Sequence, residues 1–178
     1  LDPGLFYFIL SLKDGRSELK AFSPERNFAE TPVRVVDEEP PYSLRIPEAV
    51  VTDVRNFRER VKRYSAGDED DVRFRAYRVP MGVYEQRRSG SFMARVRVTA
   101  GVITAHQIRA LADAADVFGN STLHCTTRQD IQIHDVELEN APKLFEKLLE
   151  AGLVCRGGGG NTVRTVTADP FAGIDPDE

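Results

Sequence analysis

The sequence has few cysteines and no long apolar run, and these absences exclude several classes of protein. Its two cysteines, Cys125 and Cys155, are too few for a disulfide framework and lack the close spacing of a structural zinc site. We therefore expect two free thiols and no metal site built by this chain. The longest apolar run, residues 5–10, falls far short of the roughly 20 residues that a membrane-spanning helix requires.

The N-terminal stretch also lacks the marks of a signal peptide. No basic residue precedes its apolar run and no small-residue cleavage site follows it, so we expect a cytoplasmic protein with no membrane partner. The chain starts at Leu1 and ends on the acidic residues 175–178, as a domain cut from a longer protein would, although processing would explain the start equally well.

Acidic residues slightly outnumber basic ones, 28 to 24, and the basic residues are mostly arginine. The formal net charge of −4 argues against a protein that coats nucleic acid. The sequence has 19 Arg and 5 Lys, so most of its cationic side chains end in planar guanidinium groups, which can form paired hydrogen bonds with carboxylates and oxyanions. A GC-rich genome would produce the same bias.

Hydrophobic spacing and turn signals divide the chain into predicted elements. Apolar residues recur every three or four positions in residues 47–65, which indicates a helix, and alternate in residues 92–98, which indicates a strand. Thr104 and Gln107 form a predicted capping box. The expected elements are a hairpin over 4–23, an irregular linker over 24–47, helices over 47–65, 104–119 and 140–152, and strands over 92–98, 121–136 and 153–155.

Strands and amphipathic helices that alternate in this way predict an α+β fold with helices covering one face of a sheet. The other face is then free to bind a ligand. On the first strand Arg95 and Arg97 point to one side, and on the second strand Arg128, Gln132 and His134 share one side. Neighbouring strands would join these side chains into a cationic wall, whereas an ordinary solvated face is the simpler interpretation for either strand alone.

Three motifs favour the cationic wall. Residues 126–134 (TTRQDIQIH) resemble the siroheme-contacting signature of nitrite and sulfite reductases. Residues 92–98 (FMARVRV), introduced by residues 84–87 (YEQR), resemble the arginine strand of that family. Residues 157–166 (GGGGNTVRTV) resemble its glycine-rich turn, in which the second arginine is usually followed by asparagine rather than by Thr165. The motifs follow the family's order and spacing, so the chain is similar to this family over about its last hundred residues.

The resemblance implies a ferredoxin-like antiparallel or mixed sheet and a role for individual residues. Siroheme carries many carboxylates, and arginine binds carboxylates through paired, charge-assisted hydrogen bonds. Arg95 and Arg164 match the two arginines that face nitrite or sulfite at the iron. The residues implied to contact siroheme are Arg97, Thr126, Thr127, Arg128, Gln132 and His134.

The resemblance also implies what this chain lacks. The family's four cysteine ligands of the 4Fe-4S cluster belong to a later region, so the chain alone is expected to be inactive in the six-electron reduction of sulfite or nitrite. Residues 1–70 would form an N-terminal hairpin, linker and helix, residues 71–156 the ferredoxin-like half domain, and residues 157–178 the start of the siroheme domain. Expected partners are an electron donor such as ferredoxin or a partner subunit, the missing second half, and, for the isolated fragment, a second copy of itself.

Two other functions remain open from the residues themselves. A non-catalytic ferredoxin-like module could use the same arginines to bind an anion, a tetrapyrrole or a protein. An RNA-binding sheet is disfavoured, because such a sheet carries stacking aromatics on its polar face and Phe92 lies on the opposite one. The four glycines at 157–160 lack the lysine and the following helix of a phosphate loop.

Overall fold

The computed structural model describes residues 7–11, 18–23, 29–31 and 46–167, and the chain divides into two compact units, residues 1–38 and 39–178. The first unit holds a three-stranded antiparallel sheet of β1 (Tyr7–Ser11), β2 (Glu18–Ser23) and β3 (Ala29–Thr31). The pairing of β1 with β2 confirms the predicted hairpin. The short strand β3 lies in the segment expected to be an irregular linker, and the rest of that segment up to residue 45 lies outside the described residues.

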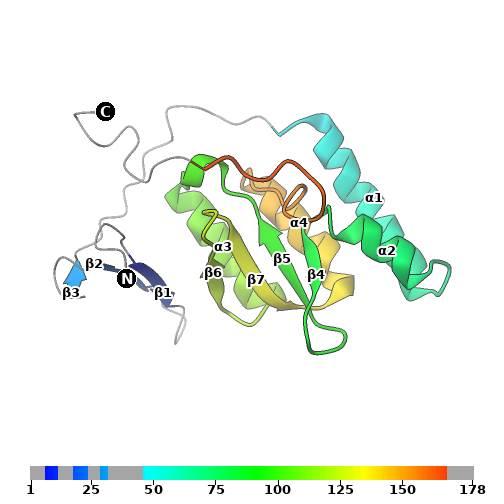
Figure 1. Ribbon diagram of the computed structural model, residues 1–178, viewed down its shortest axis with the longest axis horizontal. Helices are drawn as coiled ribbons and strands as arrows, with labels where there is room; N and C mark the ends of the chain where they lie inside the picture. The colour runs from blue at the N-terminus through cyan, green and yellow to red at the C-terminus, as the bar shows by residue number, and fades with distance from the viewer. Residues whose placement is uncertain (1–6, 12–17, 24–28, 32–45, 168–178) are drawn as a thin grey trace. The chain divides into compact units, whose positions relative to one another are not determined.

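The second unit is built on a four-stranded sheet in which every neighbouring pair is antiparallel (Figure 1). Its strands in spatial order are β4 (Val83–Glu85), β5 (Phe92–Val96), β7 (Ile131–Val136) and β6 (Leu123–Cys125). The strands at the centre, β5 and β7, carry several fully buried residues, among them Ala94, Val96 and Ile133.

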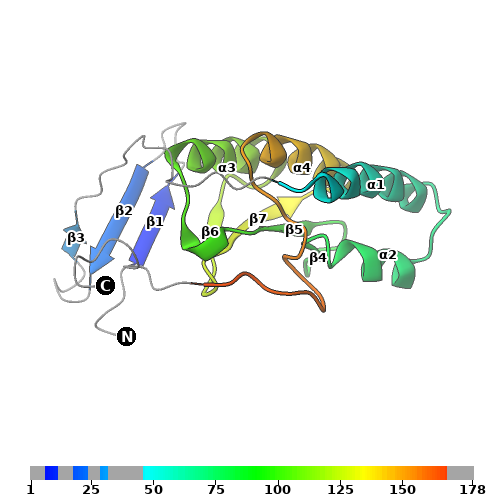
Figure 2. The ribbon, with the colours of Figure 1, turned by 90° about the horizontal axis from the view of Figure 1, so that it is seen from above.

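Helices cover one face of this sheet and leave the other free of helices (Figure 2). They are α1 (Glu48–Ser65), α3 (Ala105–Phe118) and α4 (Ala141–Glu150), with the shorter α2 (Asp71–Arg78) packed beside α1. The α+β architecture with helices on one face is therefore as the sequence predicts, and the sheet is purely antiparallel. Among the described helices none is long and apolar enough to cross a membrane.

Local sequence explains where these helices begin and what they bury. Thr104 and Gln107 form the predicted capping box at the start of α3, each side chain accepting the other's backbone N–H at 3.1 Å. In α1 the buried residues Val50, Val54 and Phe57 recur at helical spacing, so one stripe faces the core. The ring of Phe57 stacks on Phe145 of α4 with centroids 4.9 Å apart, which joins α1 to the helical layer.

Several predicted local features are wrong. Helix α2 and strand β4 lie where neither was expected. Asn140 precedes α4 as predicted, but its side chain makes no capping bond and donates to Glu137 instead. Residues 153–155 form only an isolated bridge between Val154 and Arg97. The expected division at residues 70 and 156 stays a prediction, although by compactness α1 belongs with the sheet.

Candidate functional site

The face of the sheet opposite α1, α3 and α4, called the open face below, gathers four of the eight predicted site residues: Arg95, Arg97, Gln132 and His134. Arg95 of β5 lies directly opposite Gln132 of β7, and Gln132 lies opposite His124 of β6. Because directly paired residues in an antiparallel sheet point to the same side, these three side chains form a row across three strands. By alternation along their strands, Arg97 and His134 lie on the same face.

Arg95 is half-buried and has no acidic partner among the described residues. Its guanidinium lies 5.7 Å from the ring of Tyr84, and its Nε is buried without a hydrogen-bond partner in the structure. Two arginines of the helical layer differ from Arg95 in this respect, because Arg58 pairs with Glu146 and Arg60 with Glu69. A buried guanidinium N–H without an acceptor is costly, so the described structure leaves an unsatisfied donor at Arg95.

Arg97 and Arg164 are connected through the residue that follows Arg164. The Nε of Arg97 donates to the hydroxyl of Thr165 at 3.2 Å, and Thr165 is buried. Arg164 itself is half-buried, and no ion pair holds it within the described part of the chain. The structure therefore places the chain that carries Arg164 beside the strand that carries Arg97.

Arg128 is not on a strand, contrary to the sequence interpretation. Residues 126–130 form a tight turn between β6 and β7, in which the backbone N–H of Thr126 donates to Asp130 O at 2.8 Å. The hydroxyl of Thr126 accepts from the backbone N–H of Asp130 at 3.0 Å and of Arg128 at 3.3 Å. Thr127 and Arg128 are exposed at this turn, and Arg128 has no acidic partner among the residues described.

His134 is held by neighbours on the open face. Its Nδ1 lies 3.1 Å from Gln86 Nε2, and its ring stacks on His124 with centroids 5.9 Å apart. Burial lowers the pKa of His134, and the nearby His124 lowers it further, while Asp135 acts in the opposite direction. The neutral imidazole is thus favoured in the folded chain.

This lowered pKa predicts a pH dependence. Because the folded state binds its proton more weakly than the unfolded state, where the pKa is about 6.5, the contribution of His134 to stability is complete above that value and declines as the pH falls below it. Histidine titration followed by NMR should show His134 titrating below the ordinary histidine pKa of about 6.5. His124→Gln should move the pKa of His134 upward. A His134 pKa at or above the ordinary value would contradict the packing described.

The glycine run at 157–160 lies against the open-face side of β4 and β5, where the chain crosses the sheet opposite the helices (Figure 2). A Cβ at Gly158 would lie 2.7 Å from the carbonyl oxygen of Arg95. One at Gly159 would overlap the hydroxyl of Tyr84 and lie 2.5 Å from the carbonyl oxygen of Val79. Glycine is needed here because two backbones approach each other closely.

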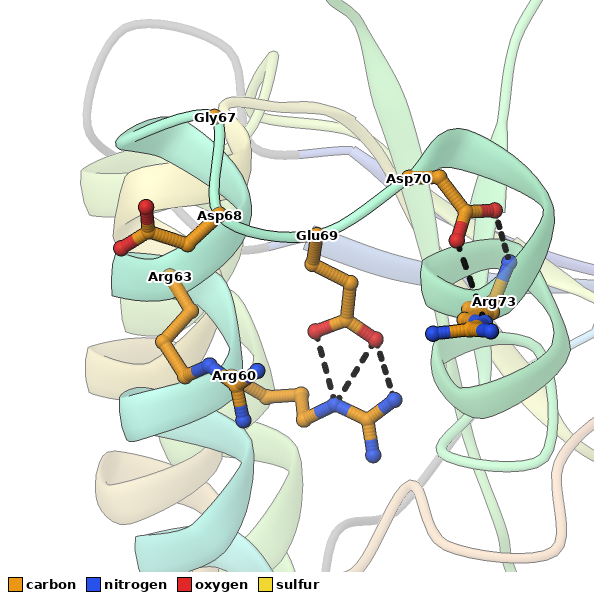
Figure 3. A pocket seen from close by; sticks show the side chains of 7 residues that line it. All are labelled: Arg60, Arg63, Gly67, Asp68, Glu69, Asp70 and Arg73. Carbon is orange, nitrogen blue, oxygen red and sulfur yellow. Dashed lines mark hydrogen bonds and ion pairs between the residues drawn. The ribbon is translucent and has the colours of Figure 1, made fainter.

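The described residues also line one cavity away from the open face. It measures about 320 Å³ and lies where α1 ends and α2 begins, lined by Arg60, Arg63, Gly67, Asp68, Glu69, Asp70 and Arg73 (Figure 3). Arg60 pairs with Glu69, and Arg73 pairs with Asp70 at 3.3 Å. Most of the charged side chains that line the cavity are therefore paired with one another. None of the predicted site residues lines it. We therefore place the candidate site on the open face.

Four antiparallel strands with helices covering one face define the larger unit as a ferredoxin-like α+β domain. Residues 84–151 match the model of the nitrite/sulfite reductase ferredoxin-like half domain, and over this part the chain is similar to the nitrite/sulfite reductase family.

Individual relatives agree with this assignment. The chain is 39% identical over 100 residues to a ferredoxin–nitrite reductase of Leptolyngbya laminosa, covering 55% of this chain and 20% of that protein. It is 37% identical over 123 residues to an assimilatory ferredoxin-dependent nitrite reductase of Haloferax mediterranei, covering 62% and 21%. The solved structure of the Mycobacterium tuberculosis NirA protein matches with a TM-score of 0.60 at 27% identity, covering 68% of this chain and 26% of that one. The chain thus spans about a fifth of the length of these curated relatives.

Some residues of the open face were not identified from the sequence as site residues. His124 could have been found, because it lies at an even spacing from Gln132 and His134 within the predicted strand region 121–136. The structure pairs it directly with Gln132. Tyr84 belongs to a recognised motif, but its position beneath Arg95 depends on β4, which was not predicted. Within the described residues, no three His, Cys, Asp or Glu side chains lie close enough to hold a metal ion.

Proposed function

We propose that this chain is the N-terminal part of a siroheme-dependent nitrite or sulfite reductase, and that it supplies contacts to siroheme and to the oxyanion. The curated relatives include proteins named for each substrate, among them the sulfite reductase [ferredoxin] of Mycobacterium tuberculosis, 34% identical over 87 residues. Since the chain spans about a fifth of such proteins, we assign the 4Fe-4S ligands and the second half of the enzyme to the remainder of a longer polypeptide.

One observation carries this proposal: the arginines of the three motifs have no carboxylate partner among the described residues. A ring with many carboxylates needs several cationic donors that are not already neutralised. Arg97 and Arg128, together with Gln132 on the open face, offer such donors, and the buried Nε of Arg95 lacks an acceptor. These residues fit siroheme in charge and in hydrogen-bonding capacity.

The predicted site residues divide into two groups with different proposed tasks. Arg97, Thr126, Thr127, Arg128, Gln132 and His134 bind and orient the macrocycle through its periphery. Arg95 and Arg164 attract nitrite or sulfite, hold it in place and stabilise the negative charge that develops as its oxygens are removed. When bound, siroheme supplies the iron at which the anion is reduced, with electrons from a donor such as ferredoxin.

The stacked position of Arg95 suits this task. Tyr84 lies against the guanidinium at 5.7 Å from its ring centroid, which limits the freedom of the side chain without neutralising its charge. A fixed cation loses little conformational entropy when it binds an anion, so more of the interaction free energy is available to stabilise the reacting anion. Arg95 is therefore better suited to hold a small oxyanion than an exposed, mobile arginine would be.

The proposal is tested by siroheme retention in the full-length reductase. Arg128→Ala should weaken siroheme binding by about tenfold or more, because it removes charge-assisted hydrogen bonds to the ring's carboxylates. The siroheme content per polypeptide, read from the absorbance spectrum after gel filtration, measures this loss. Nitrite and sulfite should each be offered with reduced ferredoxin, since the comparisons include both kinds of reductase.

Arg55→Ala is the matched control, because Arg55 is exposed on α1 on the other side of the sheet. It removes one arginine without touching the open face and should leave the siroheme content unchanged. Equal siroheme loading in the Arg128 and Arg55 variants would contradict the assigned role. A full-length protein that binds siroheme but lacks cysteine ligands for the cluster would favour a non-catalytic tetrapyrrole-binding module instead.

A further inference from the structure

A buried carboxylate lies beneath the three motifs. Asp130, the last residue of the turn between β6 and β7, is completely buried. Its Oδ1 accepts a hydrogen bond from the Thr165 hydroxyl at 2.7 Å and from the backbone N–H of Val98 at 3.3 Å. Its Oδ2 is buried and has no hydrogen-bond partner in the structure. Burying a carboxylate costs free energy unless hydrogen bonds or a nearby cation compensate for the lost water. Packing in the hydrophobic core therefore does not explain why residue 130 is acidic.

Thr165 transmits this interaction to Arg97. A hydroxyl has a single proton, and Arg97 Nε is a donor only, so the Thr165 hydroxyl must accept from Arg97 and give its own proton to Asp130. The direction of both bonds is therefore fixed. Each bond has one charged end, which makes it stronger and more directional than a bond between neutral groups.

The carboxylate connects three segments that are distant in the sequence. Asp130 follows Arg128 by two residues in the turn, Val98 follows Arg97 at the end of β5, and Thr165 follows Arg164. Residues 161–167 have one backbone hydrogen bond to another described segment, from Ala100 N to Val166 O at 3.2 Å. The side-chain bond from Thr165 is thus a substantial part of what attaches this segment to the sheet.

We propose that Asp130 is a positioning residue that, through Thr165, fixes Arg97 and the segments carrying Arg128 and Arg164 relative to one another. The inference rests on the proposed function, because this arrangement matters to the reaction only if those arginines bind siroheme and the oxyanion. Asp130 is completely buried and would therefore contact neither ligand. It acts by holding the guanidinium of Arg97 and the backbone beside Arg164 in one arrangement before any ligand arrives.

The arrangement can be tested without siroheme, in the full 178-residue chain. The Nε–H resonance of Arg97 in ¹⁵N NMR reports the bond to Thr165 directly. Thr165→Val keeps the side chain's shape but removes the hydroxyl, and should speed hydrogen exchange at Arg97 Nε by about tenfold or more. Asp130→Ala should have the same effect, because Thr165 loses the acceptor that orients its proton. Thr165→Ser keeps the hydroxyl and should retain the slow exchange.

Backbone amide exchange in β5 and β7 is the control for a general loss of structure. If Arg97 Nε exchanges as slowly in folded Thr165→Val as in the wild type, the inference is wrong. If Asp130→Ala does not fold, the comparison of Thr165→Val with Thr165→Ser still decides. In the full-length reductase, siroheme content should fall in Thr165→Val and return in Thr165→Ser. A wild-type protein without siroheme would overturn the proposed function. The NMR result would still test the role of Asp130, because it does not depend on siroheme.

Discussion

Replacing Arg95 with alanine is expected to lower the turnover of nitrite or sulfite by the full-length reductase about 10²–10³-fold, the range found when one preorganised donor to a developing anion is removed. The side chain is half-buried, has a buried Nε without an acceptor, and lies over Tyr84 rather than beside an acid. Its interaction with substrate is therefore not shared with an internal carboxylate. Most of the siroheme should remain bound, because the ring contacts are proposed for other residues, Arg97 and Arg128 among them.

Steady-state reduction of each anion, together with the siroheme absorbance of the same samples, measures this effect. Arg95→Lys should recover part of the rate, since it restores the charge but not the planar fork. Arg55→Ala, on the opposite side of the sheet, should match the wild type. If Arg95→Ala lost its siroheme in proportion to its activity, Arg95 would be a cofactor contact and the division of tasks proposed above would fail.

Phe57→Ala is expected to lower the free energy of unfolding by about 3–5 kcal/mol, the usual cost of removing a large buried ring. Phe57 is fully buried in α1 and stacks between Phe145 of α4, at 4.9 Å, and Tyr77 of α2, at 6.1 Å between ring centroids. The variant leaves a cavity where three helices meet. Such a loss is a large part of the stability of an ordinary domain.

Urea denaturation followed by far-UV circular dichroism measures this change. Val72→Ala is the control, because Val72 is 78% exposed in the same helical layer and its removal should change stability by no more than about 0.5 kcal/mol. Similar midpoints for the two variants would show that α1 contributes little to the larger unit. The boundary expected near residue 70 would then be favoured over the compact unit that begins at residue 39.

The sequence predicted the long, strongly periodic elements. Helix α1 showed its buried stripe and α3 its capping box, both of which are local signals that survive in the fold. The short elements were missed for physical reasons. Helix α2 follows an acidic run and has few apolar residues, and β4 has three residues, too few to show alternation. Such elements are stabilised by packing on their neighbours rather than by their own propensity.

The candidate site was predicted in its composition but not in its geometry. Arg95 and Gln132 lie on one face, as alternation predicted, and the resemblance identified the segments that carry Arg128 and Arg164. Arg128 was placed on a strand because its turn has no glycine or proline; the left-handed residue of that turn is Gln129, with φ of 60°. The hydrogen bond between Thr165 and Asp130 joins residues that are 35 positions apart, and no sequence pattern predicts it.

The close approach of the glycine run limits how this chain can diverge. Any side chain at position 159 would meet the backbone carbonyl of Val79, and removing the Tyr84 hydroxyl would relieve only part of the overlap. A protein with alanine there would have to carry its chain along a different path over the sheet, displacing the arginine and threonine a few residues later. Gly90, by contrast, has no atom within 4 Å of where a Cβ would lie. A substitution at position 159 would therefore move Arg164 and Thr165, whereas a substitution at position 90 would be opposed only by the positive φ of its backbone.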